Sequence, residues 1–202
     1  VCEGTNITLA GTGATSYSWD NGVTQGIAFA PTATTTYTVT GTTLGCTNTS
    51  TVTVTVNPIP NVNAGNDISI CASGSTTLTA SGATTYSWSP GGLTTAEITV
   101  SPAATTSYTV TGTSLGCTAT DIVTVTVAGN APINAGPDVE LCIGASTTLN
   151  GTGGDTYLWD NGLGNGNNFT ISPASTTTYT VIGTDASGCV GTDAITVTVN
   201  PL

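Results

Sequence analysis

Apolar and polar positions alternate over many short stretches of this chain. The runs TVTVTV at residues 51–56 and ITVTV at 195–199 place valine or isoleucine at every second position, with threonine between them. Shorter runs of the same kind lie in the middle of the chain, at residues 75–81, 84–90, 96–102, 106–112 and 121–127. A period of two is typical of a β-strand with one buried face, and no stretch has the 3.6-residue period of a helix. The pattern predicts an all-β protein, with turns at the Gly-, Asn- and Pro-containing segments between the runs.

The same pattern occurs three times along the chain. A leading cysteine recurs at a nearly constant interval, and a tryptophan follows each leading cysteine at the same offset. A tyrosine recurs at a constant interval, and a trailing cysteine follows it at nearly the same offset each time. These positions are Cys2, Cys71 and Cys142, then Trp19, Trp88 and Trp159, then Tyr37, Tyr108 and Tyr179, and finally Cys46, Cys117 and Cys189. Such self-similarity predicts tandem structural repeats.

The repeats predict three domains, at residues 1–57, 58–128 and 129–202. Short Pro- and Asn-containing linkers join them, VNPIPNVNAGND at 56–67 and AGNAPINAGPD at 128–138. The first repeat opens at its leading cysteine and lacks the strand that residues 62–70 supply to the second. We expect this segment to belong to a longer array, and an unpaired sheet edge to accept a strand. That strand comes from preceding residues of the same chain or from a neighbouring subunit of a filament.

Each repeat has the features of an immunoglobulin-like β-sandwich. Six or seven short strands fit into about 70 residues, with a tryptophan after the second clear strand and a tyrosine at the start of a late strand. We interpret Trp19, Trp88 and Trp159 as core anchors between the two sheets. The residues Tyr37, Tyr108 and Tyr179 are interpreted as corner residues whose hydroxyl groups bond nearby backbone.

The six cysteines predict disulfides, because there is no histidine and no C-x-x-C spacing to suggest a zinc site. Disulfides indicate an oxidising compartment, and therefore an extracellular protein. We favour pairing within each repeat, because closing a loop of about 46 residues stabilises a small domain by about 4 kcal/mol. The alternative joins a leading cysteine to the trailing cysteine of the next repeat, and leaves two cysteines for neighbouring chains or further repeats. The favoured pairs are Cys2–Cys46, Cys71–Cys117 and Cys142–Cys189, and the alternative is represented by Cys71–Cys189, with Cys46 and Cys142 left over.

The charge balance excludes several classes of partner. The 202 residues contain no lysine, arginine or histidine and 11 acidic residues, which gives a net charge of −11. Nucleic acid and anionic membrane surfaces repel such a chain. No run of 18 apolar residues occurs, so we expect no membrane insertion.

Catalysis is not expected, since only scattered carboxylates are available as acids or bases. Two of them differ between repeats: Asp20 corresponds to Ser89, and Asp121 corresponds to Ser50. The one cofactor that the sequence suggests is calcium, which prefers oxygen ligands. Its candidate ligands are Asp67 and Asp138, which occupy equivalent places in the two linkers.

The pattern AGxDxxxC…LTASGATTYSWSPGG…ITVSPAATTSYTVTGTSLGCTATDIVTVTV resembles the Ig-like or PKD-like repeats of giant cell-surface proteins of Bacteroidetes-type bacteria. These include gliding-motility adhesins and substrates of type IX secretion. The resemblance implies a non-catalytic structural segment of a stalk, filament or adhesin at the bacterial surface, next to further copies of the repeat. The alternative is a module that binds glycans or surfaces through the loops of the third repeat, where GDTYLWDNGLGNGNNFT is rich in Gly and Asn.

Overall fold

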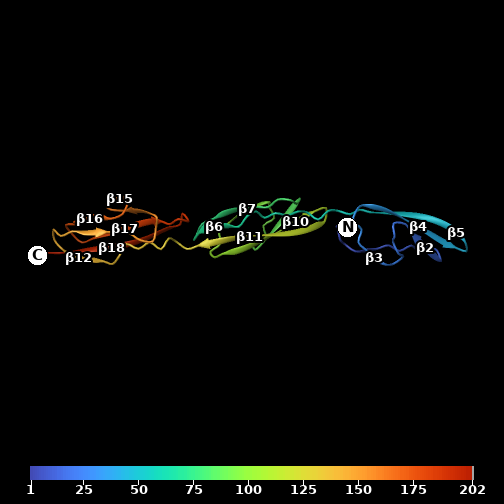
Figure 1. The fold of residues 1–202 in the computed structure, drawn as a ribbon, viewed down its shortest axis with the longest axis horizontal. Helices are drawn as coiled ribbons and strands as arrows, with labels where there is room; N and C mark the ends of the chain where they lie inside the picture. Colours follow the sequence, from blue (N-terminus) through green and yellow to red (C-terminus); the bar gives the residue numbers. More distant parts are fainter. Residues whose placement is uncertain (202) are drawn as a thin grey trace. The chain divides into compact units, whose positions relative to one another are not determined.

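A computed structural model describes residues 1–201 of the chain, and Leu202, the last residue of the predicted third repeat, lies outside the described residues. The described part contains eighteen β-strands and no α-helix (Figure 1). The all-β prediction is confirmed. Residues 1–201 thus offer no helix long and apolar enough to cross a membrane.

The strands of the first repeat form two separate sheets. One has three strands in the order β2-β4-β5, and the other pairs β1 with β3. The long strands β4 and β5 are antiparallel, from Thr35 opposite Val54 to Thr43 opposite Cys46. The bounds are β1 Ile7–Thr8, β2 Ser16–Trp19, β3 Ala28–Phe29, β4 Thr35–Thr43 and β5 Cys46–Val54.

The second repeat has the same two sheets with one strand more. Its larger sheet has the order β6-β11-β10-β8, and its smaller sheet pairs β7 with β9. The additional strand β6 runs parallel to the end of β11, with Cys71 opposite Ala128. The bounds are β6 Ile68–Cys71, β7 Thr76–Thr79, β8 Thr85–Ser89, β9 Glu97–Val100, β10 Thr106–Ser114 and β11 Cys117–Ala128.

The third repeat follows the second closely. Its larger sheet has the order β12-β18-β17-β14-β15, and β13 pairs with β16. The parallel pair is β12 with β18, which places Cys142 opposite Asn200. The bounds are β12 Val139–Cys142, β13 Thr147–Leu149, β14 Thr156–Trp159, β15 Gly164–Asn165, β16 Phe169–Ile171, β17 Thr177–Thr184 and β18 Val190–Asn200.

The alternation in the sequence produces the buried faces of these sheets. In β11, Val123 and Val125 are fully buried and Thr124 between them is half-buried. The equivalent Val197 in β18 is also fully buried, in a core that contains Trp159 and Leu149. Successive side chains of a strand point to opposite faces, so one valine face enters the core and the threonine face stays accessible. Two sheets with such inner faces make the immunoglobulin-like sandwich that the sequence predicts.

Backbone contacts divide the chain into two compact units. One comprises Val1–Asn66, Leu78–Ile98 and Tyr108–Val123, and the other comprises Asp67–Thr77, Thr99–Ser107 and the chain from Thr124 onward. This division cuts through the second repeat. The three-domain boundaries proposed from the sequence therefore stay a prediction.

Candidate functional site

Two disulfides lie at the junctions between repeats. Cys2 bonds to Cys117 with a Cα–Cα separation of 5.6 Å, and Cys71 bonds to Cys189 with a separation of 5.4 Å. Each bond joins the leading cysteine of one repeat to the trailing cysteine of the next. The favoured prediction of pairing within each repeat is therefore wrong, and the alternative pattern is the one observed.

The length of the last strand in each repeat explains this pairing. The trailing cysteine Cys117 begins β11, whereas the leading cysteine Cys71 lies opposite Ala128, at the end of the same strand. The extended strand between these two positions separates them by roughly 35 Å. A disulfide requires Cα atoms within about 7 Å. The two cysteines of one repeat therefore lie too far apart to bond, while the end of one repeat meets the start of the last strand in the next.

Two cysteines remain free among residues 1–201. Cys46 and Cys142 are free thiols on the exposed surface, whereas the bonded Cys117 and Cys189 are buried. Cys46 is the trailing cysteine of the first repeat, and Cys142 is the leading cysteine of the third. They are the two that the observed pairing pattern leaves without a partner within the chain.

The first linker lies against the second repeat as an extended segment. The backbone of Asn63 exchanges two hydrogen bonds with Ser81, at 3.0 and 2.9 Å. The next residue, Ala64, is only 2% exposed. A Cβ atom on Gly112 would lie 2.5 Å from a methyl carbon of Val62. The linker therefore covers the core of the second repeat, and Gly112 leaves room for it.

The second linker covers the third repeat in the same way. Asn134 exchanges two backbone hydrogen bonds with Thr152, at 3.0 and 2.9 Å. Ala135 is 2% exposed, and Ile133 belongs to the core cluster of this repeat. Glycine at position 183 is required, because a Cβ atom there would overlap the side chain of Ile133.

One carboxylate in each repeat fixes the linker that covers it. The Oδ2 atom of Asp121 accepts a hydrogen bond of 2.8 Å from the Ala64 N–H, and Oδ2 of Asp193 accepts one of 2.8 Å from the Ala135 N–H. These backbone hydrogen bonds lower the pKa of both carboxyl groups, because they favour the ionised form. Sequence reasoning assigned no role to Asp121 because Ser50 replaces it in the first repeat. Within residues 1–201, no linker segment covers the first repeat, where Ser50 stands at this position.

The candidate calcium ligands take part in the same arrangement. Oδ1 of Asp67 accepts a hydrogen bond of 2.7 Å from the Thr124 N–H, and Oδ1 of Asp138 accepts one of 2.7 Å from the Thr196 N–H. No group of three or more His, Cys, Asp or Glu side chains that could hold a metal ion occurs in the described range. Calcium binding at these two carboxylates stays a prediction.

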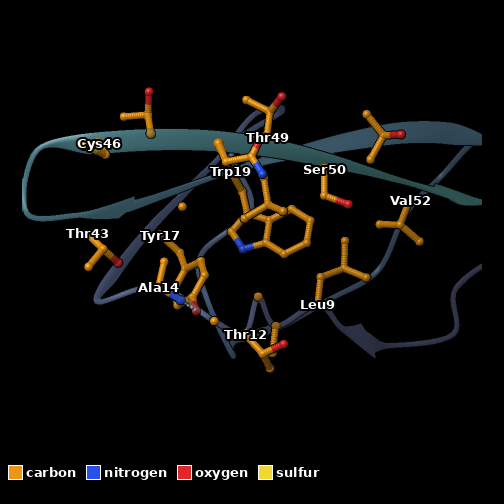
Figure 2. Close-up of a pocket in the computed structure, with 18 of the residues that line it drawn as sticks. Leu9, Thr12, Ala14, Tyr17, Trp19, Thr43, Cys46, Thr49, Ser50 and Val52 are labelled. Carbon is orange, nitrogen blue, oxygen red and sulfur yellow. Dashed lines mark hydrogen bonds between the residues drawn. The ribbon is translucent and has the colours of Figure 1, made fainter.

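A groove of about 710 Å³ opens on the first repeat at the place that a linker covers in the other two. Figure 2 shows the Trp19 indole in the middle of this groove, with Tyr17 and Ala14 towards one end and Leu9 and Val52 towards the other. Val52 is 38% exposed, whereas the equivalent Val123 is 0% and Ile195 is 4% exposed. The same inward face is thus accessible in the first repeat and sealed in the others.

The aromatic residues follow this difference. Trp88 and Trp159 are buried, whereas Trp19 is half-buried in the open groove. The rings of Tyr37, Tyr108 and Tyr179 are buried. The hydroxyl groups that bond nearby backbone belong to a different set, in which Tyr86 donates to the Ala83 carbonyl at 2.8 Å. The other members of that set are Tyr17 and Tyr157.

The Gly- and Asn-rich loop of the third repeat is held by its own side chains. The side-chain amide of Asn167 makes two hydrogen bonds of 2.7 Å with the Gly151 backbone. Asn161 donates to the side chain of Asp160 at 3.0 Å and to the Thr178 carbonyl at 2.9 Å. These amides support the loop, and no specific observation favours glycan binding by it.

Solved structures that match this chain include tandem immunoglobulin domains. No protein-family model matches it, and a search of curated proteins found no match either. Among solved structures, an I-band fragment from titin matches with 14% identity and a TM-score of 0.46, covering 98% of this chain and 94% of that chain. Immunoglobulin domains 1–4 of Sidekick-1 match with 15% identity and a TM-score of 0.36, covering 99% and 73%. The paired sheets and their buried inner faces, and not these matches, identify the chain as a tandem array of immunoglobulin-like β-sandwich repeats.

Proposed function

We propose that this chain is a non-catalytic structural segment of an extracellular stalk, filament or adhesin at a bacterial surface. The observation that carries the proposal is the pairing of Cys2 with Cys117 and of Cys71 with Cys189. Each bond connects one repeat to the next, so the array is covalently linked across its junctions as well as along its backbone. Disulfides persist in oxidising compartments, which supports an extracellular location. The resemblance of the repeats to Bacteroidetes-type surface proteins supports the bacterial surface.

Cross-links of this kind change how the chain carries a pulling force. The shortest covalent path runs from Cys2 across to Cys117, back along the chain to Cys71, and across to Cys189. At about 3.5 Å per extended residue, this path of about 60 residues has a maximum extension of about 210 Å. With both disulfides reduced, the path of about 200 residues reaches about 700 Å. The oxidised array thus resists lengthening even when repeats unfold.

Single-molecule force spectroscopy on the chain, held by its two ends, tests this function. We expect an extension limit of about 210 Å without reductant and of about 700 Å after reduction, by the covalent paths described above. The Cys46→Ser variant is the matched control, because it removes a cysteine outside both disulfides and leaves the limit unchanged. An oxidised chain that extends as far as the reduced one contradicts a force-bearing role.

A further inference from the structure

The groove of the first repeat has the shape of the linker sites in the other two repeats. Gly41 occupies the place of Gly112 and Gly183, at which a Cβ atom would meet Val62 and Ile133 of the linkers. The three atoms nearest to a Cβ atom on Gly41 would belong to Ala14 and Tyr17, which line the groove itself. The first repeat therefore has the small residue that a linker requires, but no part of residues 1–201 occupies that space.

The hydrogen-bonding groups for a linker are also available. Thr12 occupies the place of Ser81 and Thr152, which each exchange two backbone hydrogen bonds with a linker asparagine. Within the described residues, the Thr12 backbone has no such pair. Thr12 lies at the rim of the groove (Figure 2). An extended segment in the groove would satisfy these groups by adding a short bridge to the sheet edge.

Cys46, which lies beside the groove, indicates which kind of partner supplies this segment. It follows a two-residue hairpin, Leu44-Gly45, with φ values of 50° and 81°. The equivalent Leu115-Gly116 hairpin has φ values of 51° and 80°, and Cys117 after it bonds to the preceding repeat. The backbone of the first repeat is therefore already in the conformation that the second repeat uses at a disulfide junction.

The third repeat presents groups that are complementary to this hairpin. At the existing junction, Cys2 pairs with Asn57, and Nδ2 of Asn57 donates a hydrogen bond of 2.9 Å to the Leu115 carbonyl. In the third repeat, Cys142 pairs with Asn200 in the same parallel manner, and its thiol is free. The first repeat thus has the hairpin, and the third repeat has a cysteine and an asparagine equivalent to those that contact such a hairpin at the existing junction.

We propose that the first repeat is a receptor for the end of another repeat of this same kind. Its groove binds a Val-Asn-Ala-Gly linker segment in extended conformation, and Cys46 forms a disulfide with the leading cysteine of the repeat that precedes this segment, as Cys117 does with Cys2. Two thiols become one disulfide, and a small disulfide such as oxidised glutathione takes up the two electrons and two protons and leaves as two thiols. The inference rests on the proposed function in one respect, namely that further repeats of this kind are present as partners.

The residue at the position of Ala14 determines which linker side chain the groove accepts. In the second repeat, Ala83 and the linker residue Val62 both lie against Gly112. In the third repeat the linker residue is the larger Ile133, and Gly154 takes the place of Ala83. The first repeat has Ala14 at this position, as the second does. The groove is therefore specific for valine over isoleucine, because an added methylene in a filled site causes overpacking.

Binding of a synthetic peptide with the sequence of residues 58–68, PIPNVNAGNDI, tests the groove. Isothermal titration calorimetry at physiological salt, which screens the repulsion between the acidic chain and the peptide, is expected to give saturable one-to-one binding. The isoleucine version of the peptide should bind about tenfold more weakly, and Ala14→Gly should remove that difference.

Ser50→Asp should strengthen binding about fivefold, because it restores the acceptor that Asp121 supplies in the second repeat. A peptide with leucine in place of its alanine, the counterpart of buried Ala64, should not bind.

Absence of saturable binding by the valine peptide at millimolar concentration would overturn the groove assignment. So would equal binding of the valine and isoleucine peptides, a comparison that needs no altered protein. A folded chain that passes the force test and fails here leaves the proposed function in place and removes only this inference.

Mixtures of two variants that each keep one free cysteine test the proposed disulfide at Cys46. Cys46→Ser and Cys142→Ser chains are incubated with oxidised glutathione, separately and together, and analysed by mass spectrometry without reductant. We expect a cross-linked dimer only in the mixture, through Cys46 of one molecule and Cys142 of the other. Dimers of similar yield from either variant alone would show unspecific oxidation of exposed thiols and overturn the assignment.

Discussion

The carboxylate of Asp121 accepts a 2.8 Å hydrogen bond from the backbone N–H of Ala64, which lies 57 residues earlier in the chain. The same relationship holds between Asp193 and Ala135. In both cases the bonded alanine is buried against the repeat, so the carboxylate fixes the linker at the point where it closes the core.

Removing this acceptor should loosen the linker. In the Asp121→Ser variant, which copies the first repeat, the Ala64 N–H loses its partner, and a buried donor without an acceptor is destabilising. We expect faster amide hydrogen exchange at Ala64 and at Asn63, whose bridge to Ser81 depends on the linker position. Asp155→Asn is the control, because its carboxylate is exposed and makes no such bond in the described chain. Unchanged exchange at Ala64 in the serine variant would contradict this role.

The two linker-binding carboxylates should also make the array sensitive to acid. Backbone hydrogen bonds lower the pKa of Asp121 and Asp193 in the folded state. Such groups contribute stability above the unfolded-state pKa of about 3.9, and that contribution is lost as the pH falls through the lower folded-state pKa. We therefore expect urea midpoints that are level between neutral pH and about pH 5 and that decrease below about pH 4. In the Asp121→Ser, Asp193→Ser double variant, the decrease should be smaller; an equal decrease would assign the acid sensitivity to other carboxylates.

The exposed core of the first repeat predicts a difference between two equivalent leucines. Leu149 is 1% exposed in the third repeat, whereas the equivalent Leu9 is half-buried and lines the groove. Leu149→Ala should lower the free energy of unfolding by about 2–5 kcal/mol, the usual range for a buried leucine. Leu9→Ala should lower it by less than about 2 kcal/mol, since this side chain is already partly hydrated. Hydrogen exchange of β18 and β5 amides reports each repeat separately, and equal effects would contradict an open groove.

The sequence predicts much of the fold because the strands depend on local alternation. The run TVTVTV at 51–56 and the threefold recurrence of cysteine and tryptophan suffice for the strands, the repeats and the sandwich. The disulfide pairing depends instead on the parallel pairs β6–β11 and β12–β18, which place each leading cysteine at the far end of the last strand of its repeat. The paired strands are distant in the sequence, so no local pattern predicts their pairing. The linker role of Asp121 is equally distant, since its partner Ala64 lies in another element. Its one signal in the sequence is that aspartate recurs at the equivalent positions 121 and 193 of the two repeats that follow a linker, whereas the first repeat has Ser50.

Digestion without reductant should separate the observed disulfide pattern from the one favoured by the sequence. There is no lysine or arginine for trypsin, so the appropriate enzyme is a glutamate-specific protease, which cuts after Glu3, Glu97 and Glu140. Because Cys2 bonds to Cys117 and Cys71 bonds to Cys189, we expect two cross-linked products. They are residues 1–3 joined to 98–140, and residues 4–97 joined to 141–202.

Labelling free thiols before digestion provides the control for this experiment. Iodoacetamide should modify Cys46 and Cys142, which both fall in the second of the two products, and should leave the first product unlabelled. Pairing within each repeat would instead release residues 141–202 alone, with an internal disulfide, and would join the three other fragments together. Mass spectrometry distinguishes the two results directly. Release of that fragment would remove the covalent link between repeats, and with it the basis for a force-bearing array and for the disulfide proposed at Cys46.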